Sequence, residues 1–83
     1  MAPLTLTKEE HEVLSLIDPK LASEFCKTES GYRYSRLRTH EADWFLEDVM
    51  RLTRSRRYHH RTAVAIESPA GRSLIEKMRE ATP

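Results

Sequence analysis

Eleven consecutive residues, RLTRSRRYHHR at positions 51–61, hold five arginines and two histidines and no acidic residue. The planar guanidinium group of arginine binds phosphate and carboxylate groups through paired hydrogen bonds. Histidine is polar when neutral and attracts phosphate when it is protonated. A segment with this composition is suited to a polyanionic partner, and we predict that this partner is double-stranded DNA.

A second arginine-rich stretch, YRYSRLR at positions 32–38, belongs to the same basic block. Over residues 30–62 the chain has eight arginines, no lysine and four acidic residues, so the block carries 8 − 4 = +4, whereas the whole chain carries +1. Tyrosines lie among these arginines, and aromatic rings beside arginines are typical of nucleic-acid contact surfaces. The predicted contact residues are Arg33, Arg36, Arg38, Arg54, Arg56, Arg57, Tyr58, His59, His60 and Arg61.

The same composition allows a second interpretation, in which the protein is a small protein-interaction module or a phage-type inhibitor. The basic segment would then dock on an acidic partner protein. Alternatively, the acidic start of a helix at residues 39–48, which contains Glu41 and Asp43, would cover the nucleic-acid site of a partner. A third interpretation is that the arginines form a solvated surface without a partner.

Signals for catalysis and for metal binding are weak in this sequence. Its two glycines form no phosphate-binding loop, and His40 has no serine or cysteine nucleophile placed beside it by a known motif. The histidines and Cys26 lack the spacing of zinc ligands. We therefore predict a non-enzymatic protein without metal or cofactor, with the single Cys26 in or near the core. The absence of a long apolar run and of a signal-peptide pattern favours a cytoplasmic protein with no membrane partner.

Capping signals predict where the first two helices begin. Thr7 and Glu10 form a capping-box pattern, in which each side chain binds the backbone N–H of the other residue. Asp18, followed by a proline, is a typical start for a second helix, which we predict over residues 19–28.

The central part of the chain is predicted to contain one short extended segment and the longest helix. Residues 32–38 alternate tyrosine with polar residues, which favours a short strand, with a basic turn of helix as the alternative. Thr39 caps a helix over residues 39–52, along which Glu47 and Arg51 have the spacing of an ion pair.

The helical period fades after residue 52, and the sequence that follows is consistent with a β-hairpin. We predict one arm at residues 53–58, a tip at residues 59–60 and a return strand at residues 62–67. Ser68 and Pro69 then begin a last helix. Trp44 is also assigned to the core, and the residues predicted to be buried are Leu14, Phe25, Phe45, Val49, Ile66 and Leu74.

The stretch RRYHHRTAVAIESPAGRSLIEKM resembles the wing and the following helix of winged-helix transcriptional regulators of the MarR type. In that family a basic hairpin has a return strand of small and aliphatic residues, and a Ser/Thr-Pro-x-Gly-Arg-x-Leu-Ile pattern begins the next helix. Here Arg61 precedes TAVAIE, and SPAGRSLI follows. The opening LTKEEHEVLSLI also resembles the first core helix of the family.

The resemblance implies a DNA-binding transcription regulator and a possible homodimer. Together with the element pattern, it predicts a small, mostly helical α+β domain over residues 1–83. This winged-helix-like domain would have a C-terminal basic β-hairpin followed by a helix.

Overall fold

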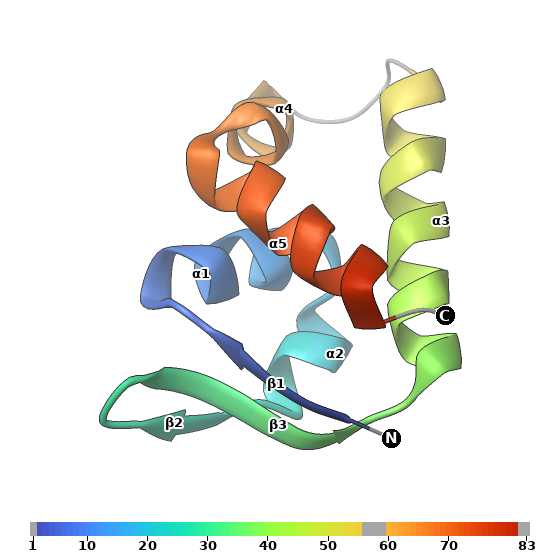
Figure 1. Ribbon diagram of the computed structural model, residues 1–83. Helices are drawn as coiled ribbons and strands as arrows, with labels where there is room; N and C mark the ends of the chain where they lie inside the picture. Colours follow the sequence, from blue (N-terminus) through green and yellow to red (C-terminus); the bar gives the residue numbers. More distant parts are fainter. Residues whose placement is uncertain (1, 56–59, 82–83) are drawn as a thin grey trace.

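The computed structural model describes residues 2–55 and 60–81. Over these residues the chain has an α+β fold, in which the helices lie on one side of an antiparallel sheet with strand order β1-β3-β2 (Figure 1). The elements in chain order are β1 (Ala2–Leu6), α1 (Lys8–Ile17), α2 (Pro19–Ser23), β2 (Cys26–Thr28), β3 (Gly31–Leu37), α3 (Thr39–Ser55), α4 (His60–Glu67) and α5 (Pro69–Ala81).

The helix starts predicted for the first two helices are confirmed. Thr7 Oγ1 accepts a hydrogen bond from the Glu10 N–H at 3.2 Å, and Glu10 Oε1 accepts one from the Thr7 N–H at 2.8 Å. Asp18 Oδ1 accepts a hydrogen bond from the Leu21 N–H at 3.1 Å. These caps satisfy backbone donors that have no partner within the helix, which is why the local sequence is sufficient to place them.

The second helix is shorter than predicted, because α2 ends at Ser23 and residues 26–28 form the edge strand β2. Strand pairing overrides the helical pattern here, since Cys26 pairs with Arg33 and Thr28 pairs with Gly31. The turn depends on Gly31, whose φ of +138° is a conformation that side chains rarely adopt. A Cβ atom at this position would also overlap the backbone oxygen of Leu6.

The predicted extended segment at residues 32–38 is confirmed as β3, although its partner β1 was not predicted. Tyr32 and Tyr34 pair with Leu6 and Leu4, and this face of the sheet packs against the helices. The pairing register then shifts by one residue, because Ala2 pairs with Leu37, whereas regular pairing would place it opposite Arg36. The extra residue in β3 forms a β-bulge that returns Leu37 to the covered face, where it is buried.

The predicted hairpin strand at residues 62–67 is wrong, because these residues belong to α4. The predicted arm is wrong at Thr53, Arg54 and Ser55, which continue α3, whereas residues 56–59, including the tip residue His59, lie outside the described residues. On a strand, Val64 and Ile66 would share a face, but in α4 Val64 is exposed and Ile66 is buried. The run TAVAIE is short enough to fit both periods, and packing of α4 against α1 and α5 selects the helix.

The SPAG sequence therefore joins two helices rather than a strand and a helix. Ser68 Oγ donates to the Ala65 carbonyl oxygen at 2.6 Å and accepts from the Gly71 N–H at 3.1 Å, as expected of the predicted cap. Gly71 is buried against the end of α4, where an added Cβ atom would overlap the carbonyl oxygens of Ala65 and Ile66. Glycine is thus required at this position by the close approach of two backbones.

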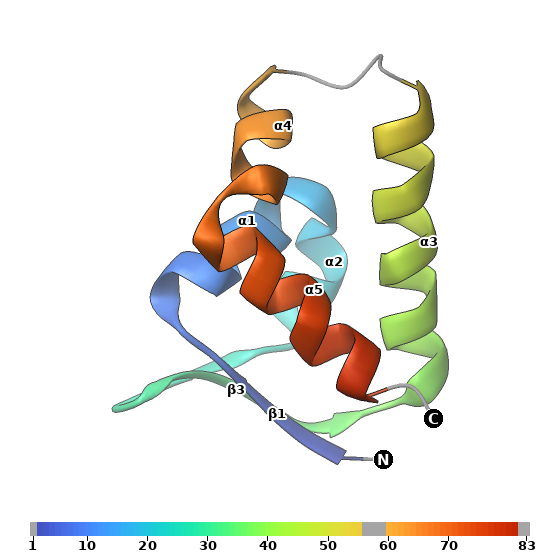
Figure 2. The same ribbon diagram turned by 45° about the horizontal axis from the view of Figure 1, so that its top comes forward.

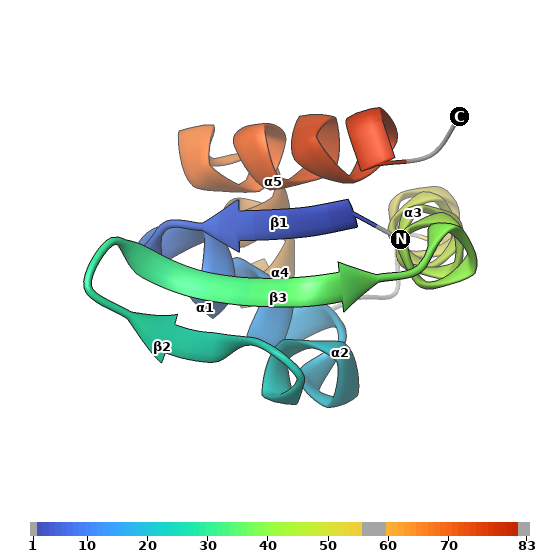
Figure 3. The same ribbon diagram turned by 60° about the horizontal axis from the view of Figure 1, so that its bottom comes forward.

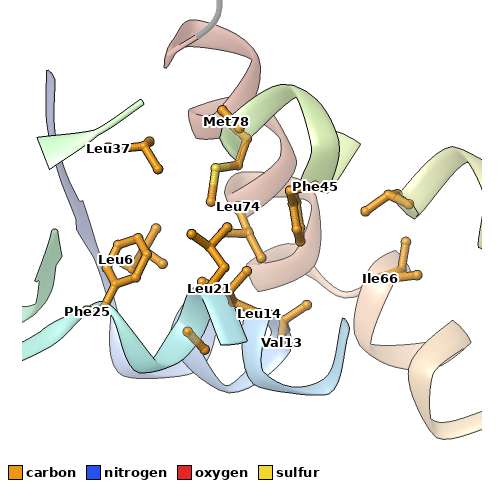
Figure 4. Packing of buried hydrophobic residues seen from close by; sticks show 13 residues of the cluster. Leu6, Val13, Leu14, Leu21, Phe25, Leu37, Phe45, Ile66, Leu74 and Met78 are labelled. Atoms are coloured by element: carbon orange, nitrogen blue, oxygen red, sulfur yellow. The ribbon is translucent and has the colours of Figure 1, made fainter. Parts of the chain in front are cut away.

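The core lies between the sheet and the helices, and side chains from several helices converge in it (Figure 4). All six residues predicted to be buried are confirmed. The assignment of Trp44 to the core is wrong, because its side chain is 60% exposed while Phe45 is fully buried. Successive residues on a helix point about 100° apart, so α3 cannot direct both rings inward. The buried apolar residues are Leu6, Val13, Leu14, Leu21, Ala22, Phe25, Leu37, Ala42, Phe45, Val49, Ile66, Leu74 and Met78.

One charged residue, Glu10, is buried beside this core, with an exposed fraction of 2%. Its Oε1 accepts a hydrogen bond from Lys77 Nζ at 2.7 Å, and its Oε2 accepts one from Ser73 Oγ at 2.6 Å. Lys77 Nζ also donates to the Thr5 carbonyl oxygen at 3.0 Å. Burial raises the pKa of Glu10, but the hydrogen bonds from Lys77, Ser73 and the Thr7 N–H outweigh it and hold the pKa below its ordinary value of 4.5.

We predict that Glu10→Gln lowers the free energy of unfolding at pH 7 by on the order of 3 kcal/mol, because it leaves Lys77 beside an uncharged partner. The depressed pKa of Glu10 means that its contribution is fully present above pH 4.5 and is lost as pH falls through the pKa of the folded state. The difference in the free energy of unfolding between parent and variant should therefore become smaller at acidic pH. Urea unfolding at several pH values measures it, and Glu9→Gln, which is exposed, is the matched control.

We predict that Phe45→Ala lowers the free energy of unfolding by roughly 3–5 kcal/mol, because it opens a cavity in the core. The neighbouring Trp44→Ala should cost less than about 1 kcal/mol, since that ring is mainly in solvent. Thermal or urea unfolding of the two variants provides the comparison. Equal melting of the Phe45 variant and the parent would contradict the orientation of α3.

Candidate nucleic-acid interface

The structure separates the predicted contact residues into two groups. Arg33, Arg36 and Arg38 lie on or directly after β3, beside the sheet. Arg54 lies in the last turn of α3, at the opposite end of this helix from Arg38 (Figure 2). At 1.5 Å per residue, the positions of Arg38 and Arg54 are about 24 Å apart along the helix axis. The predicted residues therefore do not form one continuous surface.

One group, which includes Arg54, lies where α3 ends and α4 begins, and we call this surface the α3–α4 end. Its described members are the predicted residues Arg54, His60 and Arg61, to which the structure adds Arg51. All four are exposed. Figures 1 and 2 place the last turn of α3 and the first turn of α4 at the same end of the molecule. The other predicted members, Arg56, Arg57, Tyr58 and His59, lie outside the described residues.

Arg51 was not among the predicted contact residues, and its spacing from Glu47 predicted an ion pair between the two. In the structure Arg51 Nη1 lies 3.5 Å from Asp48 Oδ1 instead. The two side chains are 76% and 43% exposed, so water screens this pair strongly. Arg51 can therefore exchange Asp48 for another anion at small cost, which adds it to the α3–α4 end.

The backbone also favours an anion at the start of α4. His60 and Arg61 stand in its first turn, where backbone N–H groups have no carbonyl partner within the helix. These groups carry partial positive charge, and so reinforce the charge of the side chains.

The other group was predicted to contain Arg33, Arg36 and Arg38, but only Arg33 and Arg36 lie on the outer face of the sheet. Arg33 pairs with Thr5 and Cys26 across the sheet, and these residues point away from the helices. Figure 3 shows that no described helix covers this outer face. The bulge in β3 keeps Arg36 exposed, because strict alternation after Tyr34 would turn it toward the core.

The two tyrosines of β3 face the helices rather than the arginines of the outer face. The Tyr32 ring stacks on the His11 ring with their centroids 3.8 Å apart, and the Tyr34 ring packs edge-on against Phe25 at 5.4 Å. Both tyrosines are half-buried, so they serve the fold and are not arranged for stacking on nucleic-acid bases.

Other kinds of site find little support in the described part of the chain. No group of three or more histidine, cysteine, aspartate or glutamate side chains there could hold a metal ion. Across residues 2–55 and 60–81, no helix has both the length and the apolar character needed to cross a membrane. Comparison of the chain with protein-family models, with curated proteins and with solved structures found no match.

The predicted core position of Cys26 is wrong, because the residue is exposed on β2 beside Arg33. We therefore predict that Ellman's reagent modifies one thiol per folded chain at a rate within about tenfold of that of the urea-unfolded chain. The absorbance of the released thiolate follows the reaction. Modification only at the rate of global unfolding would place Cys26 inside the fold and contradict the β2–β3 pairing.

Proposed function

We propose that the protein binds double-stranded DNA without catalysis, by contacting backbone phosphates at the α3–α4 end. One observation carries the proposal: the segment 51–61 has five arginines and no acidic residue, and its described arginines are all exposed. Phosphate contacts of this kind supply most of the affinity that is independent of DNA sequence. Regulation of transcription is the role that such binding would serve.

The form of the proposed contact differs from a wing. Because α4 stands where the return strand of a hairpin was predicted, the arginines are presented by the end of one helix and the start of the next. The start of α4 suits phosphate contact through its backbone N–H groups, whereas the end of α3 contributes only side chains held by a rigid element.

The outer face of the sheet supports the proposal less well. It presents Arg33 and Arg36, but its neighbouring strands contribute Thr5 and Cys26 rather than further cations. Arg38 stands apart from this face, beside Glu41 at the start of α3. Two arginines on an open sheet give fewer phosphate contacts than the α3–α4 end.

The salt dependence of binding tests the proposal. Fluorescence anisotropy with a short labelled duplex of random sequence, repeated at several salt concentrations, gives the slope of log affinity against log salt. We expect a slope of about −0.9 for each phosphate contact. The double variant Arg54→Gln, Arg61→Gln should reduce the magnitude of this slope by roughly 1–2 units, because two contacts are lost.

The matched control is Arg33→Gln, Arg36→Gln, which removes the same charge from the opposite end of the molecule. We expect this variant to keep the slope of the parent. Circular dichroism confirms that both variants remain folded. A parent chain that does not bind the duplex at low salt would refute the proposal, and a change of slope only in the control variant would move the interface to the sheet.

A further inference from the structure

A cleft of about 450 Å³ lies between α2 and the first turns of α3, at the opposite end of α3 from Arg54 and the α3–α4 end. Tyr34, on β3, also lines it, so the cleft is formed by three different elements. Its lining residues are Asp18, Lys20, Leu21, Glu24, Tyr34, Arg38, His40, Glu41 and Trp44. The cleft combines aromatic rings with carboxylates, which is a combination suited to organic cations.

The aromatic wall of the cleft is formed by Trp44, the only tryptophan of the chain. Its side chain is 60% exposed, although burial of so large a ring would stabilise the fold. The His40 ring contacts it edge-on, with the centroids 4.8 Å apart and the planes at 63°. His40 thus supports one side of the indole while much of the indole surface remains open to a ligand.

Two of the carboxylates in the cleft are held in place by hydrogen bonds. Glu41 accepts hydrogen bonds from the Tyr34 hydroxyl at 3.2 Å and from the Arg38 backbone N–H at 3.1 Å, and it is half-buried. Asp18, also half-buried, caps α2 through Oδ1. The third carboxylate, Glu24, is exposed just after α2. No hydrogen bond or ion pair to its side chain is present among the described residues.

The positive groups of the cleft are Lys20 and Arg38, and both side chains are exposed. Long exposed side chains can turn into solvent, whereas Glu41 cannot leave without breaking its hydrogen bonds. Burial raises the pKa of Tyr34, the hydrogen bond to Glu41 and the charges of Glu41 and Glu24 raise it further, and Arg38 opposes them. The three carboxylates of the cleft outnumber its two cations, and Glu41 is fixed by its hydrogen bonds, so the cleft is net negative.

We propose that this cleft binds an arginine side chain of a partner protein, with the guanidinium group stacked on Trp44 and paired with Glu24 and Glu41. Arginine suits the site better than lysine, because its planar group can stack on a ring and bind a carboxylate through two donors. The net negative charge of the cleft disfavours phosphate, so the partner is a basic protein segment rather than nucleic acid. The site is independent of the DNA-binding proposal, because it uses different residues at the other end of α3.

The single tryptophan provides the test, since its fluorescence reports the cleft directly. The folded chain is titrated with N-acetyl-arginine amide, with the isosteric but neutral N-acetyl-citrulline amide, and with the lysine and glutamate analogues. We expect a saturable change in emission with the arginine compound, with a midpoint in the millimolar range that rises with salt. The lysine compound should bind at least about threefold more weakly, and the other two should give no saturable change.

Two substitutions locate the binding. Glu24→Gln removes a surface carboxylate of the cleft without disturbing a buried contact. It should lower the affinity for the arginine compound by roughly 3–10-fold. Asp43→Asn removes the charge next to Trp44 in the sequence but outside the cleft, and it should leave the midpoint unchanged. NMR amide shifts on binding should cluster around Leu21, Glu41 and Trp44. An unsaturable response, an equal response to citrulline, stronger binding of the glutamate compound or an unchanged Glu24 variant would each overturn the proposal.

Discussion

The buried carboxylate of Glu10 is the interaction on which the rest of the architecture depends. It caps the start of α1 by accepting a hydrogen bond from the Thr7 N–H. It also joins α1 to α5 by accepting hydrogen bonds from Ser73 and Lys77. Lys77 in turn binds the Thr5 carbonyl of β1, so a strand and two helices from the two ends of the chain meet at one charge. A buried ion stabilises a fold only when all its partners are in place, which makes this junction specific as well as strong. The junction joins β1, α1 and α5, and most other elements pack on these: β3 on β1, α2 and α4 on α1, and α3 on α5.

The helix α3 separates two surfaces of opposite character. Its last turn contributes Arg54 to a basic surface, and its first turns contribute Glu41 and Trp44 to a negatively charged aromatic cleft. The apolar side of the helix packs against the core through residues such as Phe45, and this packing holds the two surfaces at a constant distance. Such a molecule is suited to bring a polyanion and a basic protein segment together on one small chain. The two proposals, a DNA-binding surface and a cleft for an arginine of a partner, are therefore compatible, because they use different residues.

Sequence reasoning succeeded where structure is decided locally and failed where it is decided by packing. The caps at Thr7 and Asp18 and the burial of Phe45 followed from side-chain chemistry and helical spacing. The segment 62–67 fits both a strand and a helix, and only its contacts with α1 and α5 choose between them. The separation of the arginines into two groups follows from the length of α3, which places Arg38 and Arg54 at its opposite ends. The open cleft beside Trp44 could not be predicted, because it requires knowing which of two adjacent aromatic residues faces inward.

The β-bulge in β3 makes this strand tolerant of the loss of one residue at a single place, which its composition does not reveal. The extra residue between Tyr34 and Leu37 brings Leu37 back under the helices and leaves Arg36 outside. A point substitution on the outer face leaves this arrangement intact. Loss of one codon at the bulge, for Ser35 or Arg36, would restore strict alternation and leave Leu37 two residues after Tyr34, on the covered face of the sheet. Natural variation in this strand can therefore include the loss of one residue between Tyr34 and Leu37, as well as residue replacement on the outer face.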